Sequence, residues 1–386
     1  MHMITRAVVS AGIVLGTVVS VAACAADGPT ATGTDAGTGT SASTDRSTPT
    51  STPTRSGAGT VDFGPAPDVS GAPACSSLLP EDLAAAVVPG ARPVDLLGEA
   101  AHVAGTEAFL VAVGGASCTA SDGVAPLDDQ VPGRRGDPVF EGVQLTVLPA
   151  GLDALAEHRE FDAVSALEGC SASDSARVYC ATDARAGSAW VTLSATRLQD
   201  DADAVPERVQ PAFDALLAAV VDRVSASSLG TADDDRADPD GSITRCDADN
   251  VNAVADTTLA VGPFPNSSTA PEPTDFARNR VGAESCVFVS DDQETGHVRT
   301  GAIYTHLPEG GWVAEQRIAA GAIDRSGRID LDGLGAGDGA WRTCDERACS
   351  VDVVRDGDWT HWVLFTEDAA DTATAIGSWV ERSSRV

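Results

Sequence analysis

The side chains that most often carry chemistry are unevenly represented in this chain. All 25 basic residues other than histidine are arginine, and lysine is absent. A Schiff-base lysine, a phosphate-loop lysine and a Ser-x-x-Lys nucleophile are therefore excluded. The 57 acidic residues give a formal charge of −32. Nucleic acid and anionic lipid head groups are bound chiefly through basic patches, so neither is an expected partner.

The histidines offer little support for catalysis. His297, His306 and His361 fall in predicted strands, where two of them could meet across a sheet. The sequence contains neither a His-Glu-x-x-His pair nor a Gly-x-Ser-x-Gly nucleophile elbow. We therefore expect no catalytic residue, no metal site and no cofactor. A secreted hydrolase stays open as an alternative, because among so many carboxylates some pair must lie close in space.

Two glycine- and aspartate-rich segments are candidate ligand sites. Gly335 to Ala340 formally satisfies the nucleotide-binding pattern Gly-x-Gly-x-x-Ala, but a predicted strand follows it where a helix is required, which favours a turn. Asp235, Asp238 and Asp240, followed by Gly241, offer oxygen ligands for calcium, but their spacing fits no EF-hand loop. A solvated acidic linker is the favoured interpretation of this second segment.

Five of the six tryptophans lie in the second half of the chain: Trp312, Trp341, Trp359, Trp362 and Trp379. Trp359 and Trp362 have opposite parity on one predicted strand, so they point to opposite faces of a sheet. One of them is expected outside the core unless it is covered, and both are candidate ligand contacts. The alternative is that all five belong to the core.

The cysteines indicate a duplicated domain. Apart from Cys24, they are Cys75, Cys118, Cys170 and Cys180, followed by Cys246, Cys286, Cys344 and Cys349. The two sets are offset by 171, 168, 174 and 169 residues, a nearly constant spacing. Short separations favour Cys170–Cys180 and Cys344–Cys349 as disulfides across hairpins, which leaves Cys75–Cys118 and Cys246–Cys286 to join a helix to a strand. A zinc site is disfavoured because no Cys-x-x-Cys spacing occurs.

The first residues predict export. A short basic start and an apolar stretch end in Val21-Ala22-Ala23-Cys24, which resembles the lipobox of bacterial lipoproteins. This resemblance implies that residues 1–23 are a signal peptide and that Cys24 is lipidated. Cleavage near Ala26, with Cys24 discarded, is the alternative. The lipid would hold the chain to the outer face of the cell membrane.

Composition then divides the exported chain. Residues 24–70 are rich in Ser, Thr, Gly and Pro and predict a disordered tether, with O-glycosylation of residues 48–54 left open. The first repeat is assigned to 71–225, an acidic linker to 226–242 and the second repeat to 243–386.

Hydrophobic periodicity predicts the same kinds of elements in both repeats. The first is expected to contain helices at 80–88, 152–161 and 209–224 and strands at 144–148 and 190–196. The second is expected to contain a helix after Asp247, helices at 312–320 and 369–380, and strands at 285–289, 299–306, 350–354 and 361–365. This order indicates an α+β fold of two tandem repeats, each an antiparallel sheet with helices packed on one face and held by disulfides.

Residues 75–83, Cys-Ser-Ser-Leu-Leu-Pro-Glu-Asp-Leu, resemble the Cys-Ser-Leu-Leu-Thr-Pro-x-Glu-Leu opening of actinobacterial surface lipoproteins with a domain of unknown function. Cys118 and the Gly335–Ala340 segment lie where that family has a second cysteine and a Gly-x-Gly-Asp-x-Ala segment. Leu79 departs from the family's threonine, and the second repeat lacks the proline. More distantly, the chain resembles the extracellular sensor domains of mycobacterial receptor kinases. Neither resemblance implies catalytic residues.

The expected function is a non-catalytic ligand-binding or sensor module in the cell envelope. Its partner would be a small molecule, a wall glycan or an envelope protein, and it would touch the membrane only through its lipid. A structural or partner-docking lipoprotein is the main alternative.

Overall fold

The computed structural model describes the chain in several stretches: residues 60–67, 74–99, 102, 104–122, 140–161, 168–173, 177–199, 203–227, 229, 260–262, 271–292, 297–331, 333–344 and 348–364. Within these stretches no helix is both long and apolar enough to span a membrane. The predicted signal peptide, Cys24, the acidic linker with its candidate calcium ligands, Cys246, the helix after Asp247 and the C-terminal helix with Trp379 all lie outside the described residues.

The first repeat alternates short helices with strands and closes on a long helix. Its elements are α1 (Cys75–Leu78), α2 (Glu81–Val87), β1 (Arg92–Val94), α3 (Leu96–Glu99), α4 (Glu107–Ala112), β2 (Ala116–Ser121), β3 (Gly142–Leu148), α5 (Leu152–Phe161), β4 (Gly169–Ser173), β5 (Arg177–Ala186), β6 (Ala189–Leu198) and α6 (Pro206–Ala226).

The second repeat follows the same plan. Its elements are β7 (Ala260–Gly262), α8 (Pro273–Arg280), β8 (Glu284–Asp292), β9 (His297–Leu307), α9 (Gly311–Ala320), the 3₁₀ turn η1 (Arg325–Gly327), β10 (Arg328–Ile329), β11 (Gly339–Cys344), β12 (Cys349–Arg355) and β13 (Asp358–Leu364).

The two sheets share one topology. The first sheet has the order β1-β2-β3-β6-β5-β4, and the second has the order β7-β8-β9-β13-β12-β11, with β10 added at its edge. All neighbouring strands pair antiparallel. Matching strand orders, element by element, are what a duplicated domain produces. The α+β fold of two disulfide-bonded antiparallel sheets is therefore confirmed.

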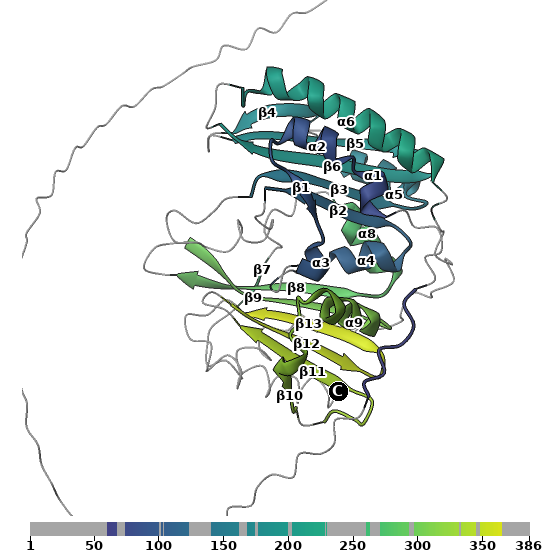
Figure 1. The fold of residues 1–386 in the computed structure, drawn as a ribbon, viewed down its shortest axis with the longest axis vertical. Helices are drawn as coiled ribbons and strands as arrows, with labels where there is room; N and C mark the ends of the chain where they lie inside the picture. The colour runs from purple at the N-terminus through teal and green to yellow at the C-terminus, as the bar shows by residue number, and fades with distance from the viewer. Residues whose placement is uncertain are drawn as a thin grey trace, which may run out of the picture. The chain divides into compact units, whose positions relative to one another are not determined.

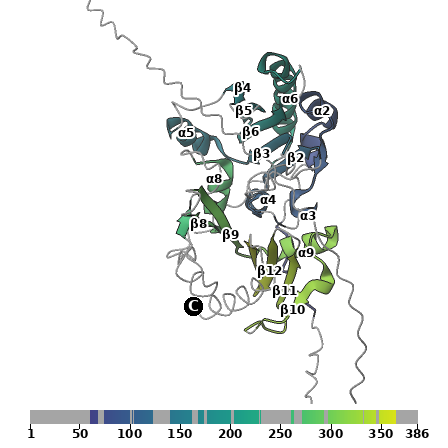
Figure 2. The ribbon, with the colours of Figure 1, turned by 90° about the vertical axis from the view of Figure 1, so that its left-hand side faces the viewer.

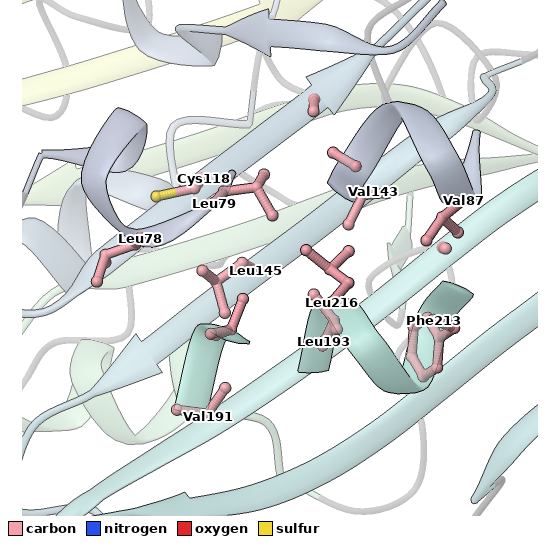
Figure 3. Close-up of a cluster of buried hydrophobic side chains, with 14 of the residues drawn as sticks. Leu78, Leu79, Val87, Cys118, Val143, Leu145, Val191, Leu193, Phe213 and Leu216 are labelled. Carbon is pink, nitrogen blue, oxygen red and sulfur yellow. The ribbon is translucent and has the colours of Figure 1, made fainter. Parts of the chain in front are cut away.

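One face of the first sheet packs against helices α1, α2 and α6 (Figure 1). Alternate residues of the central strands, among them Val143, Leu145, Val191 and Leu193, point to this face, as their period of two requires. They meet the buried stripe of α6, in which Phe213 and Leu216 are prominent (Figure 3). The buried stripe predicted along residues 209–224 is thus confirmed.

Each repeat contributes a helix that packs against the other repeat. The residues just before α4 lie on the second sheet, where Thr305 of β9 donates a hydrogen bond to the Ala104 carbonyl, and α3 packs against α9, where Arg317 donates to the Leu97 carbonyl. Gly105, at φ +75°, lies so close to Trp359 that a Cβ atom would sit 2.6 Å from its ring.

In the reverse direction, α8 of the second repeat lies against β3 (Figure 2). Arg280 donates hydrogen bonds to the carbonyls of Pro149, at 2.7 Å, and Ala150, at 3.0 Å. A single apolar cluster accordingly contains Leu148 and Trp190 from the first sheet together with Trp341 and Trp359 from the second.

Three of the predicted disulfides are present: Cys75–Cys118 between α1 and β2, Cys170–Cys180 between β4 and β5, and Cys344–Cys349 between β11 and β12. Cys286 is also disulfide-bonded, while its expected partner Cys246 lies outside the described residues.

Two local expectations need correction. Pro80 is the N-cap of α2 and the helix begins at Glu81, so the proline does not occupy the first helical position. Residues 60–67, which we assigned to the tether, lie on the second repeat: the Phe63 and Trp341 rings stack with centroids 5.8 Å apart, and the Asp62 amide donates to the Gly337 carbonyl at 2.8 Å. Val61 and Phe63 bring the apolar surface that the preceding segment lacks.

Candidate functional site

A buried ionic cluster lies on the face of the second sheet that carries α9. Asp352 on β12 accepts hydrogen bonds from Trp359 Nε1 at 2.9 Å and from His361 Nδ1 at 3.0 Å, both on β13. Arg317 of α9 places its Nε 3.3 Å from the same carboxylate oxygen. We call these four residues the Asp352 cluster.

The Asp352 cluster is sealed from solvent. The side chains of Arg317 and His361 are 0% exposed and that of Asp352 is 1% exposed. Burial alone would raise the pKa of Asp352, but the charges of Arg317 and His361 and the hydrogen bonds from His361 and Trp359 outweigh it and hold the pKa at about 2. The carboxylate is therefore a permanent anion with its partners already in place, and a substrate has no access to it.

The first repeat contains an equivalent group, which we call the Asp183 cluster. Asp183 on β5 accepts hydrogen bonds from Trp190 Nε1 at 2.7 Å and from Thr192 Oγ1 at 2.6 Å, both on β6. His158 of α5 places Nε2 3.1 Å from the other carboxylate oxygen, and its Nδ1 lies 2.9 Å from the Pro271 carbonyl oxygen. One ring nitrogen lies against the Asp183 carboxylate and the other against the Pro271 carbonyl, so His158 links the first repeat to the segment before α8.

The two clusters correspond residue by residue. Asp183 and Asp352, Trp190 and Trp359, and Thr192 and His361 are each separated by 169 residues, the same offset as Cys180 and Cys349. His158 and Arg317 occupy the same position within α5 and α9. Sequence reasoning missed this constellation, although the 169-residue offset, applied beyond the cysteines, would have revealed it.

Glu107 at the start of α4 lies within electrostatic range of Arg317. Burial raises the pKa of this carboxyl, against the opposing effects of a backbone hydrogen bond and Arg317. Its Oε2 atom is hidden from solvent and has no hydrogen-bond partner within the described stretches. A carboxyl of raised pKa near one of low pKa is the arrangement used for acid–base catalysis, but here both groups are enclosed by protein.

A second feature is polar and partly open. Facing away from α6, the central strands of the first sheet present Gln144 and Thr146 on β3 and Thr192, Ser194 and Thr196 on β6, all partly exposed. We call these five residues the hydroxyl face. Pairing across strands arranges them in rows: Thr146 lies beside Thr192, and Gln144 lies beside Ser194.

The corresponding face of the second sheet differs in chemistry. By strand order and register, Ser194, Gln144 and Thr119 correspond to Val363, Ile303 and Val287. These three apolar side chains are at most 1% exposed and pack together with Ala104. At these three positions the second repeat thus holds buried apolar side chains, whereas Thr146 and Thr192 correspond to Thr305 and His361, which are polar and buried.

Tyr179 borders the hydroxyl face. It lies on β5 opposite Thr196, and its side chain is the one large hydrophobic group that is exposed in the described stretches, at 37%. Desolvation and the nearby carboxylates of Glu272 and Asp183 raise the pKa of the phenol, so it stays protonated at neutral pH. Sequence analysis did not single out this residue.

The two tryptophans predicted from sequence as ligand contacts are buried. Trp359 and Trp362 do point to opposite faces of the second sheet, but both are buried, at 0% and 2% exposure, in two different apolar clusters. Neither projects from the core, because Gly105 of the first repeat lies against Trp359, and Trp362 packs beside Tyr304 and Phe288.

The structure also shows where two of the candidate histidines and the glycine-rich motif lie. His306 pairs with Thr360 and His361 pairs with Thr305, so the two histidines lie on opposite faces and do not meet. Gly335 to Ala340 forms a turn that leads into β11, as expected, and the Asp338 carboxylate accepts from the Gly335 amide at 2.6 Å. In the described stretches, no group of three or more His, Cys, Asp or Glu side chains could hold a metal ion.

Comparison with known proteins places the chain in no family: no family model matches it, and no curated protein does. Among solved structures it is similar to the di-domain ARO/CYC StfQ from the steffimycin biosynthetic pathway, at 8% identity, covering 77% of this chain and 99% of that one. The TM-score of 0.14 is too low to carry any argument about fold or function.

Proposed function

We propose that this chain is a non-catalytic binding module of the cell envelope, exported and held to the outer face of the membrane by lipid on Cys24. Three disulfides in the described stretches, with Cys286 bonded as well, support an oxidising compartment, because such bonds persist outside the reducing cytosol. The lipobox-like sequence before Cys24 supports the anchor.

A non-catalytic role is favoured by where the reactive groups lie. Asp352, Arg317 and His361 form the most strongly interacting titratable group, and all three are enclosed. General acid–base catalysis requires a side chain within hydrogen-bond reach of a substrate proton. The perturbed pKa of Asp352 therefore reflects an internal structural ion pair.

The hydroxyl face carries the binding proposal. The counterparts of Ser194 and Gln144 in the second repeat, Val363 and Ile303, are apolar and buried. In the first repeat the same positions hold polar side chains that remain partly exposed. Polar groups converging on one rigid surface, supported from behind by α6, are typical of a binding site.

The anchor can be tested by metabolic labelling. Cells expressing the full chain should incorporate labelled palmitate into the protein, and a Cys24→Ser variant should not. Iodoacetamide should find no free thiols in native protein. Failure of the label to enter, or alkylation of the cysteines without prior reduction, would refute the proposed location.

Binding can be tested with the unlipidated Cys24→Ser chain and washed, delipidated wall sacculi from a Gram-positive actinobacterium. We expect co-sedimentation that Thr196→Val weakens and Thr182→Val leaves intact. Thr182 is the matched control because it lies on β5 but faces the opposite side of the sheet, paired with Leu193. If protease treatment of the sacculi abolished binding, the partner would be an envelope protein and the docking alternative would hold.

A further inference from the structure

Resting on the proposed function, we infer that the hydroxyl face and Tyr179 form a binding site for a neutral, hydroxyl-rich glycan chain. The site lies on the first sheet alone, and the second repeat lacks it. Its parts are an aromatic ring at one edge and uncharged hydroxyl and amide groups across two central strands.

The arrangement of side chains suits an extended ligand. Successive rows on one face lie about 7 Å apart along a strand, and neighbouring strands lie about 4.8 Å apart. Thr192, Ser194 and Thr196 therefore present hydroxyls at regular intervals along β6, with Thr146 and Gln144 beside them on β3. Ala181, paired with Ser194, is small. Next to Thr196, the Phe140 ring fills the space beside Gly142, where an added Cβ would lie 2.6 Å from it.

The chemistry of these groups matches sugars. A threonine or serine hydroxyl both donates and accepts, and so does a carboxamide, so the face can pair with sugar hydroxyls in either direction. The Thr146 hydroxyl is hidden from solvent and the Thr192 hydroxyl donates to Asp183, so a ligand would contact Gln144, Ser194 and Thr196 among the polar groups of the face. The exposed Tyr179 ring offers an apolar platform with a polar edge, against which the C–H side of a sugar ring can pack.

The charges of the chain favour a neutral ligand over a charged one. An anionic glycan would be repelled by a chain of net charge −32. A cation would need an available carboxylate, but both oxygens of Asp183 are occupied by Trp190, Thr192 and His158. Glu272 accepts a backbone hydrogen bond in the capping box of α8.

The second repeat shows that the fold itself does not require these polar groups. The equivalents of Ser194, Gln144 and Thr119 are Val363, Ile303 and Val287, which are filled and buried without loss of the sheet topology. Tyr179 is likewise replaced by the small, buried Ala348, each lying just before the second cysteine of a hairpin disulfide. Gln144, Ser194 and Tyr179 are thus specific to the first repeat, whereas Thr146 and Thr192 correspond to the polar residues Thr305 and His361.

The inference is tested by calorimetric titration of the unlipidated Cys24→Ser chain with maltohexaose, cellohexaose and chitohexaose as neutral probes. A heparin hexasaccharide and a chitosan hexamer serve as the anionic and cationic probes. We expect at least one neutral hexasaccharide to bind and neither charged probe to do so. Tyr179→Ala should weaken binding about tenfold, and Thr196→Val about fivefold.

Two controls separate binding from folding. Tyr179→Phe keeps the ring and should retain most of the affinity, and Thr182→Val should match wild type. All variants should melt within a few degrees of the parent chain, because Tyr179 is exposed and Thr196 is partly exposed.

Each outcome decides a different point. Binding of only a charged probe, lost in Tyr179→Ala, would overturn the ligand class but keep the site. Neutral binding unchanged by Tyr179→Ala and Thr196→Val would overturn the site. No binding by any probe would overturn the inference, and the sacculus experiment would then show separately whether the proposed binding function survives.

Discussion

The indole of Trp359 donates to Asp352 at 2.9 Å, and the indole of Trp190 donates to Asp183 at 2.7 Å. In both repeats a carboxylate on the penultimate strand thus accepts a hydrogen bond from a tryptophan on the last strand. Around this shared pair the partners have diverged: Arg317 and His361 seal the Asp352 cluster, whereas His158 and Thr192 leave Asp183 at 25% exposure. The clusters stabilise the fold, while the polar surface beside the Asp183 cluster is the place where we propose that a ligand binds.

Removing the guanidinium from the Asp352 cluster should strongly destabilise the protein. Arg317→Met leaves a buried carboxylate without its main counterion, which costs about 3–5 kcal/mol. Urea denaturation at pH 7 measures the loss. Arg208→Met is the matched control, because Arg208 forms an exposed ion pair with Asp203 and should change stability by less than about 1 kcal/mol. Equal effects of the two substitutions would contradict the ionic role of Arg317.

Low pH should remove the contribution of Asp352 to the stability of the fold. Its folded pKa, about 2, lies below the ordinary 3.8, so this stabilisation is complete above about pH 4 and is lost as the pH falls through 2. The depressed pKa corresponds to about 2 kcal/mol. Denaturation at pH 5, 3.5 and 2 should show the decline, and Arg317→Met should show a smaller one. A decline of equal size in that variant would assign the acid sensitivity to other carboxyls.

The contribution of Glu107 to stability should change with pH in the opposite direction to that of Asp352. Because burial raises its pKa in the folded protein, the carboxyl favours folding when protonated, and this contribution is lost as the pH rises from 4.5 through the folded value. Glu107→Gln keeps the shape without the charge and should therefore raise the melting temperature at pH 7 but not at pH 3.5. Glu157→Gln on α5, where the side chain is exposed, is the control. Lower stability of Glu107→Gln at pH 7 would mean that the carboxylate form is needed.

The disulfides should differ in their contribution to stability according to the loops they close. The separations of 43, 10 and 5 residues for Cys75–Cys118, Cys170–Cys180 and Cys344–Cys349 predict losses of about 4, 3 and 2 kcal/mol on chain-entropy grounds. Double Cys→Ser variants, compared by chemical denaturation, give the ranking. A Cys344→Ser, Cys349→Ser variant as stable as wild type would refute a stabilising role for that bridge.

Much of the local structure was predictable, because it follows from short-range patterns. The helix at 152–161 has the predicted bounds, and Val191, Leu193 and Ala195 share a buried face as their alternation required. The hairpin disulfides followed from spacing. Helices α4 and α8 were missed, since each is short and α4 packs against α8 while α8 packs against β3 of the other repeat, contacts that no local pattern encodes.

The candidate site was less predictable for the same reason. Trp359 and Trp362 attract attention as large aromatics, but burial depends on what covers each face of the sheet, and Gly105 from 254 residues earlier lies against Trp359. Tyr179 and the hydroxyls of β6 are unremarkable in sequence. They become a candidate surface only when register places them side by side.

By itself, the sequence determined the duplication, the alternation of helices and strands and the pairing of the hairpin cysteines, because each depends on spacing along the chain. Tertiary structure alone decided which polar residues are sealed and which are accessible. Which polar residues are buried depends on how the helices of each repeat pack against the other repeat. Solvent exposure is therefore a property of long-range packing.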